Sequence, residues 1–186
     1  MCACVAFSGL GALLDDTVQT IAVHRDNVLS EMIQLYGSDA TIVHHPVKVE
    51  FIGEPGDDLG GLTRDLYTSL WSDVVRHYFI GEAAVVPYIP LHRHAECRSH
   101  YVAIGRLLAH TVALLKCIPA RLSRCCLMCL ALGAEQVSDE LLLQDFRYVT
   151  RQHSNTCVIS ITGNICILDL HYCVIIIMSF RDIHIW

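Results

Sequence analysis

Two groups of cysteine and histidine residues have the side-chain chemistry of a zinc site. Thiolates and imidazoles a few residues apart are typical zinc ligands, and two such groups together could supply the four that zinc needs. The first group is His92, His94 and Cys97, and the second is Cys125, Cys126 and Cys129. The second group falls in an apolar, helix-prone stretch, where cysteine behaves as a small hydrophobic residue. We therefore expect buried thiols, no metal and no cofactor.

An acidic, glycine-rich loop over residues 53–61 could instead hold a cation. Its carboxylates at Glu54, Asp57 and Asp58 are the oxygen ligands that Ca²⁺ and Mg²⁺ prefer. Their order differs from the Asp-x-Asp-x-Asp-Gly pattern of a calcium loop. We therefore expect a structural turn, which glycine permits through its left-handed conformations, with Arg64 paired to one of these acids.

A third pattern, Gly9-Leu10-Gly11, is a fragment of the dinucleotide-binding fingerprint. It lacks the third glycine and a preceding strand, so we do not expect it to bind a nucleotide. Nucleic acid is also a poor candidate ligand, because the 186 residues carry a net charge of −6. A polyanion is normally bound by clustered Lys and Arg side chains that neutralise its phosphates.

Hydrophobic periodicity predicts a mostly helical chain up to residue 150, with one short strand. Apolar side chains recur every third or fourth residue in most of this region. The predicted helices run from a cap at Asp26 to a stop at Gly37, from Leu62 to Tyr78, from Ser99 to Lys116, from Pro119 to a stop at Gly133, and from Asp139 to Phe146 with Ser138 as cap. Alternation over Val47–Phe51 predicts a half-buried strand. The expected fold class is α+β and predominantly helical.

A change in composition near Arg151 divides the chain. Residues 1–150 contain 21 Leu and 8 Ile, whereas residues 151–186 contain 2 Leu and 9 Ile. A helix-prone chain therefore becomes a β-prone one. We divide the chain into an N-terminal extension (1–19), a main unit (20–150) and an Ile-rich tail (151–186).

Charge is also distributed unevenly along the chain. Residues 1–80 carry 11 acids and 4 bases, whereas residues 81–130 carry 2 acids and 6 bases. Such an asymmetry indicates either intramolecular pairing or an acidic face that docks a partner.

The segment Val49–Asp65, predicted as a strand, a loop and the start of a helix, resembles the opening signature of HECT-type ubiquitin ligases. That signature has the form hydrophobic-x-Phe-x-Gly-Glu-x-x-x-Asp-x-Gly-Gly-hydrophobic-x-Arg-acid. Eight of its fixed positions agree within residues 51–65, namely Phe51, Gly53, Glu54, Asp58, Gly60, Gly61, Arg64 and Asp65. Asp65 stands where the family more often has glutamate. So many matches in so short a segment make the resemblance specific.

Flanking segments are similar to the same family. Ala22–Leu29 resembles its approach helix, hydrophobic-x-Arg-x-x-hydrophobic, and Tyr101–His110 resembles its helix with a Gly-Arg pair. The stretch that begins at Ile118-Pro119 also resembles the family. The similarity covers about residues 20–150 and looks like a divergent HECT branch. It implies the front part of a HECT N-lobe, with a short strand or hairpin element.

The resemblance also implies a mechanism in two lobes. In the family, the N-lobe holds a ubiquitin-loaded conjugating enzyme, at a site further along than the matched segment. The C-lobe carries a cysteine that accepts ubiquitin as a thioester and passes it to a substrate lysine. This is covalent nucleophilic catalysis by a thiolate. The implied partners are ubiquitin, a ubiquitin-conjugating enzyme and protein substrates that the sequence does not identify.

The acceptor cysteine of the family lies in a motif resembling Leu-Pro-x-x-x-Thr-Cys-Phe. Only Thr156 and Cys157 agree with it here, and no Leu-Pro flanks them. Cys157 also follows Glu50 by only 107 residues, too few for the rest of an N-lobe and the start of a C-lobe. We therefore expect Cys157 not to accept ubiquitin, and we assign no catalytic residue. The chain by itself is expected to lack ligase activity because the C-lobe is missing.

The Ile-rich tail admits three interpretations. Residues 161–178 approach the hydrophobicity of a membrane span, but Asp169 interrupts them at a cost of about 2.5–3.5 kcal/mol on insertion scales. Residues 157–161 and 164–168 could instead form a short strand pair. The change from Leu to Ile also fits a tail foreign to the ancestral domain, such as read-through of non-coding sequence.

The function expected from the sequence is that of a partial HECT-type ubiquitin ligase. An alternative from another class is a non-catalytic interaction module, a degenerate HECT relative that docks partners through its acidic face. A weaker alternative is a tail-anchored membrane protein. We expect an intracellular protein, cytoplasmic or nuclear. Its ten cysteines, without a basic leader ahead of the first apolar residues, are typical of reduced thiols.

Overall fold

Five α-helices and two small sheets make up the part of the chain that the computed structural model describes, residues 14–56, 58–88, 93–132 and 136–151. The elements are β1 (Gln19–Val23), the 3-10 turn η2 (Arg25–Asn27), α1 (Val28–Ser38), the 3-10 turn η3 (Thr41–His44), β2 (Val47–Phe51), α2 (Gly61–Tyr78), β3 (Phe79–Ile80), β4 (Val86–Pro87), α3 (His94–Leu115), α4 (Arg124–Leu132) and α5 (Asp139–Arg151). The predicted α+β, predominantly helical class is confirmed.

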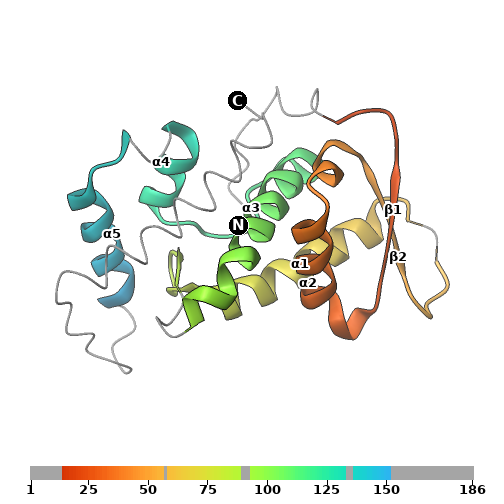
Figure 1. Cartoon of the computed structure of the whole chain (residues 1–186), viewed down its shortest axis with the longest axis horizontal. Helices are drawn as coiled ribbons and strands as arrows, with labels where there is room; N and C mark the ends of the chain where they lie inside the picture. Colours follow the sequence, from red (N-terminus) through yellow and green to blue (C-terminus); the bar gives the residue numbers. More distant parts are fainter. Residues whose placement is uncertain (1–13, 57, 89–92, 133–135, 152–186) are drawn as a thin grey trace.

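The first sheet is a parallel pair of strands joined through a helix. β1 pairs with β2 from Gln19 opposite Val47 to Val23 opposite Phe51. Parallel neighbours need a crossover connection, and α1 supplies most of it. The predicted strand over Val47–Phe51 is confirmed, with Val49 and Phe51 buried. Figure 1 shows this sheet at one side of the molecule, beside α1 and α2.

The core lies where α1, α2 and α3 meet. The predicted stripe of α2 is confirmed, because Leu66, Leu70 and Val74 are each 0% exposed. Tyr67 and Trp71 widen that stripe and are buried as well. α3 has its predicted apolar face, but it begins at His94, five residues before the expected start. In Figure 1, α4 and α5 lie at the end of the molecule opposite β1 and β2.

A short antiparallel ladder links the helical core to the region that precedes α4. β3 pairs with β4, and the Val85 N–H donates to the Arg121 carbonyl at 2.8 Å. The Ser123 N–H donates to the Val85 carbonyl at 3.0 Å, so this region is extended. The prediction that Pro119 begins a helix is therefore wrong, because backbone pairing with Val85 delays α4 to Arg124.

Two predictions at the start of the main unit are also wrong. The segment Ala22–Leu29 is not one helix, because it begins in β1, passes through η2 and enters α1 only at Val28. Ile21 and Val23 alternate with exposed neighbours and are buried against the core, which favours a strand. Asp26 does not cap α1, whose cap position is Asn27 and has no side-chain capping bond.

Helix ends follow the predicted signals only in part. Gly37 lies inside α1, which ends one residue later. Ser138 does cap α5, since its hydroxyl accepts from the Leu141 N–H at 3.3 Å. α5 continues past the predicted end at Phe146 to Arg151.

Several predictions fall on residues outside those described. These are the Gly9-Leu10-Gly11 fragment, the strand pair and membrane span of the tail, and Cys157. None of the helices that the structure describes combines the length and the apolar character needed to cross a bilayer.

Candidate functional site

The acidic loop and the start of α2 form a joint around Arg25. The Arg25 guanidinium binds Glu54 through two bonds, Nε to Oε1 at 2.6 Å and Nη2 to Oε2 at 2.9 Å. Its Nη1 donates to Asp65 Oδ2 at 2.8 Å. We call Arg25, Phe51, Glu54 and Asp65 the Arg25 cluster. It connects η2, the end of β2, the acidic loop and the first turn of α2.

Phe51 is the aromatic residue of the Arg25 cluster. The Arg25 Cζ atom lies 3.8 Å from the centroid of the buried Phe51 ring, which is cation–π geometry. Hydrogen bonds to Glu54 and then to Asp65 raise the pKa of Arg25. The bond from Arg25 in turn lowers the pKa of Glu54. Arg25 and Glu54 are therefore ionised at neutral pH, and both side chains are accessible to solvent and salt.

Asp58, in the loop, binds backbone N–H groups of both flanking elements, β2 and α2. Its carboxylate accepts from the Val49 N–H at 2.9 Å, the Gly60 N–H at 2.8 Å and the Thr63 N–H at 3.3 Å. The Thr63 hydroxyl also donates to it. Partial burial acts to raise the pKa of Asp58, but these bonds outweigh it and hold that pKa below the usual value. Asp58 thus binds amides at the start of α2 that have no partner inside the helix.

Two glycines of the loop adopt conformations that other residues rarely take. Gly53 has φ of +87° and Gly60, at the cap position of α2, has φ of +93°. A Cβ atom at either position would meet no atom within 4 Å. Backbone conformation, rather than lack of space, therefore accounts for glycine at both positions.

The predicted structural turn has a different ion pair from the expected one. Arg25, rather than Arg64, pairs with Glu54, and Arg64 is an exposed residue of α2. The cation interpretation also loses two of its ligands, since Glu54 is bound by Arg25 and Asp58 by backbone N–H groups. Asp57 lies outside the described residues.

A buried chain of hydrogen-bonded polar side chains connects α1, α2 and α3. The Tyr36 hydroxyl lies 2.7 Å from the Tyr67 hydroxyl and 2.6 Å from Nδ1 of His110. His110 Nε2 lies 2.9 Å from the His45 carbonyl, which can only accept, so Nε2 carries the proton. Burial lowers the pKa of His110 to about 4, so the ring is neutral and Nδ1 accepts from Tyr36. Tyr67 then donates to Tyr36.

Several carboxylates of residues 1–80 have partners within the same segment. Besides the Arg25 cluster, Asp15 pairs with His45 at 2.8 Å and Glu31 with His24 at 2.9 Å. Asp39 accepts from the Thr41 N–H and hydroxyl, and its pKa is lowered by these bonds. All of these pairs lie within residues 1–80 and none of them reaches a base of residues 81–130, so neither reading of the charge asymmetry is confirmed. An acidic docking face would need these carboxylates to exchange partners.

The thiols of the proposed zinc groups lie in the core. Cys97, Cys125, Cys126 and Cys129 are buried, and the Cys125 thiol donates to the Leu141 carbonyl at 3.2 Å. Burial raises the pKa of Cys125 to about 12 and that of Cys129 to about 11, so both stay protonated at neutral pH. Across the described ranges, no three His, Cys, Asp or Glu side chains are placed to hold a metal. His92 lies outside those ranges.

Neither the Tyr36–His110 chain nor the pairing of Arg25 is predicted from the sequence. His110 lies in the segment that resembles the family's Gly-Arg helix, and Tyr36 lies in the predicted helix that stops at Gly37. The sequence does place a tyrosine on the apolar face of α1, another on that of α2, and a histidine on that of α3. Buried polar side chains need partners, so such a set predicts a network.

The contacts of the joint fix the positions of η2, β2 and α2 relative to one another. Its carboxylates are held ionised by Arg25 or by N–H donors, so they accept hydrogen bonds and are poor proton donors. The thiols at Cys97, Cys125, Cys126 and Cys129 are buried away from it in α3 and α4. No protein-family model matches the chain. A search of curated proteins likewise finds no significant relative.

Proposed function

We propose that residues 20–150 are the front part of the N-lobe of a HECT-type ubiquitin ligase. One observation carries the proposal. Arg25, from the segment similar to the family's approach helix, binds two of the three acids of the signature, Glu54 and Asp65, while Phe51 lies against it. Three positions of the signature, Phe51, Glu54 and Asp65, therefore take part in the contact between the sheet and α2.

Two more signature positions have physical roles in the same joint. Asp58 binds the first amides of α2, and Gly60 supplies the left-handed residue before that helix. A joint of this kind requires particular residue types at fixed spacing, which supports a family relationship over a chance match. In this proposal the chain supplies a scaffold, and ubiquitin passes through a cysteine of a C-lobe.

The structural joint itself can be tested by grafting. Residues 20–150 would replace the matching segment of an active HECT ligase that keeps its own C-lobe. We expect the chimera to form a DTT-sensitive ubiquitin thioester with E1, a conjugating enzyme and ATP. The matched control is the same chimera with Arg25→Ala, in which α2 is less firmly held and thioester yield falls. A chimera that melts cooperatively but forms no thioester would contradict the proposal.

The chain alone is expected to form no ubiquitin thioester. Four of its described cysteines are buried, and only Thr156 accompanies Cys157 from the acceptor motif. The measurement is a non-reducing gel of the purified chain after incubation with E1, a conjugating enzyme, ubiquitin and ATP. A DTT-sensitive adduct that disappears in Cys157→Ala would overturn this expectation.

A further inference from the structure

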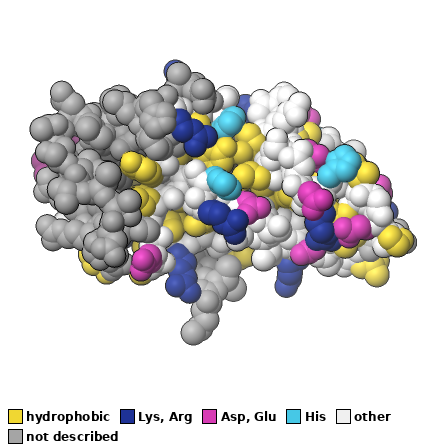
Figure 2. Space-filling model, turned by 90° about the horizontal axis from the view of Figure 1, so that it is seen from below, with side chains coloured by type: hydrophobic (Ala, Val, Ile, Leu, Met, Phe, Trp, Pro, Cys, Tyr) yellow, Lys and Arg dark blue, Asp and Glu magenta, His cyan; other side chains and the backbone are white. Residues whose placement is uncertain are grey.

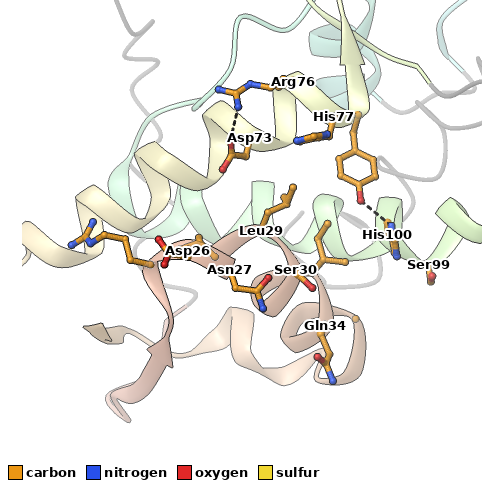
Figure 3. Close-up of a pocket in the computed structure, with 15 residues that line it drawn as sticks. Asp26, Asn27, Leu29, Ser30, Gln34, Asp73, Arg76, His77, Ser99 and His100 are labelled. Carbon is orange, nitrogen blue, oxygen red and sulfur yellow. Dashed lines mark hydrogen bonds and ion pairs between the residues drawn. The ribbon is translucent and has the colours of Figure 1, made fainter. Parts of the chain in front are cut away.

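The recess between α1, α2 and α3 carries charges of both signs, so its charge favours no particular ligand. Its volume is about 790 Å³. Asp73 and Arg76, which both line it, pair with each other at 3.4 Å on α2 (Figure 3). Figure 2 shows acidic and basic side chains intermixed on the face that it draws. The edge of β1 is a more specific surface, because exposed backbone hydrogen-bonding groups require an extended strand as their partner.

The register of the parallel pair shows which backbone groups of β1 face away from β2. The Gln19 N–H donates to the Pro46 carbonyl at 2.8 Å, and the Val23 carbonyl accepts an N–H bond at 2.9 Å from the residue after β2. Neighbouring residues of a strand direct their backbone groups to opposite sides, so those of Thr20 and Ala22 point away from β2. Both residues are exposed, and among the residues that the structure describes neither has a hydrogen-bond partner on that side.

The far side of β2 is closed by the acidic loop. The Val49 N–H donates to Asp58 at 2.9 Å, and the Phe51 carbonyl accepts from the Glu54 N–H at 3.1 Å. The loop therefore occupies the side of β2 where a further strand would pair. The corresponding side of β1 is open.

Side chains on the solvent face of the sheet also leave β1 unprotected. Edge strands are normally protected by charged residues or proline. Here the charged residues of that face, Lys48 and Glu50, belong to β2. Their neighbours on β1 are Thr20 and Ala22, which follow Val18 with its 59% exposure. Because the β1 side chains are uncharged, pairing this strand with an identical one brings no like charges together.

We infer that β1 pairs with β1 of a second copy of this chain, antiparallel and about a two-fold axis at Thr20. Thr20 then lies opposite Thr20 of the second copy, and Val18 lies opposite its Ala22. In this register the N–H and C=O groups that point away from β2 in one copy meet those of the other, because facing residues of an antiparallel pair exchange both bonds. One contact covers the open edges of both copies, whereas a flexible peptide would cover the edge of only one.

The dimer is expected to be weak and to depend on concentration. β1 has only five residues, and interfaces below about 1,200 Å² are typical of transient association. The inference does not rest on the ubiquitin-ligase proposal, since it uses neither the Arg25 cluster nor a cysteine.

Sedimentation equilibrium of the full chain, between about 10 μM and about 0.5 mM, tests the dimer. Thr20→Pro removes an N–H that points away from β2, and proline is tolerated at such a position of an edge strand. We expect this variant to associate at least about tenfold more weakly than the wild type. Thr20→Ala keeps the N–H and is the matched control, expected to dimerise like the wild type. A thermal melt followed by circular dichroism checks that both variants are folded.

Charge exchange tests the register without proline. Thr20→Lys and Thr20→Glu each place like charges directly opposite one another across the two-fold axis, so each variant alone should associate more weakly than the wild type. In an equal mixture the two variants place opposite charges there. We expect them to associate with each other at least about fivefold more tightly than either does with itself, at low salt.

Three results would overturn the inference. The wild-type chain could be monomeric over the whole concentration range. Thr20→Pro could dimerise as tightly as the wild type, which would place the contact on another surface. The two charge variants could also show no preference for each other, which would exclude the register with Thr20 on the axis.

Discussion

Arg25 binds Glu54 with both oxygens of the carboxylate, at 2.6 and 2.9 Å, across 29 positions of the chain. The pairing follows from the sheet. Because Val23 lies opposite Phe51 in a parallel register, the residues after Val23 run beside those after Phe51. Arg25 therefore reaches the acidic loop, and Asp65 meets it from the first turns of α2. The relationship predicts how this joint responds to salt and substitution.

Replacing Arg25 with methionine is expected to lower the melting temperature at low salt. Methionine keeps the apolar stem near Phe51 but removes the donors to Glu54 and Asp65. Because the pairs are exposed, salt screens them, and the difference from wild type should shrink in about 1 M NaCl. The measurement is a thermal melt at both salt concentrations. Arg64→Met is the matched control, and an equal, equally salt-sensitive loss there would favour the Arg64 pairing.

Alanine at Gly60 and at Gly61 should have opposite effects. Neither position has an atom within 4 Å of an added Cβ, so packing is the same for both. Gly60 has φ of +93°, where alanine is strained by about 1–2 kcal/mol. Gly61 is the first residue of α2, where alanine is neutral or stabilises by up to about 1 kcal/mol. Urea unfolding measures both, and equal effects would contradict the left-handed assignment.

Removing the Tyr36 hydroxyl, the central member of the buried polar chain, should destabilise the protein more than removing the Tyr67 hydroxyl at its end. Tyr36→Phe leaves both the Tyr67 hydroxyl and His110 Nδ1 without their partner, at about 1–3 kcal/mol for each orphaned group. Tyr67→Phe removes only a donor to Tyr36, at about 1 kcal/mol. The measurement is the free energy of unfolding of each variant in urea. If the two variants are equally stable, Tyr36 does not bind both Tyr67 and His110.

Stability is expected to fall on mild acidification because of His110. Its pKa is lowered by burial from 6.5 to about 4 in the folded protein, so the unfolded chain binds the proton more readily. The stabilising contribution is complete above about pH 6.5 and is lost as pH falls toward 4, amounting to roughly 3 kcal/mol. Urea unfolding at pH 7 and pH 5 should show the loss. His110→Gln should have a flatter profile, and an unchanged one would exclude His110 as the cause.

Cysteine alkylation should separate Cys117 from the buried thiols. Cys117 is partly exposed, whereas Cys125 and Cys129 are buried with raised pKa values of about 12 and 11. Since the thiolate is the reactive form, iodoacetamide at neutral pH should modify Cys117 first among these three. Peptide mapping by mass spectrometry gives the rates. Fast labelling of Cys125 in native buffer would argue for a more open α4–α5 contact.

Local pattern was sufficient to predict the five helices, although not all of their ends, and the type of the loop. The repeat of Leu66, Leu70 and Val74 predicts the buried face of α2, because helical geometry places every fourth residue on one side. The glycines at 53 and 60 predict a turn, because only glycine takes positive φ at low cost. Strand Val47–Phe51 follows from alternation in the same way.

The tertiary structure decided which side chains pair with one another. The end of β1 falls in the segment Ala22–Leu29, which resembles a helix, and without that strand nothing indicates that Arg25, rather than the nearby Arg64, reaches Glu54. Tyr36 and His110 are 74 positions apart, and their bond exists only because α1 packs on α3. Sequence periodicity reports which side of an element is apolar. Which side chains meet across elements depends on strand register and helix packing, which are properties of the whole chain.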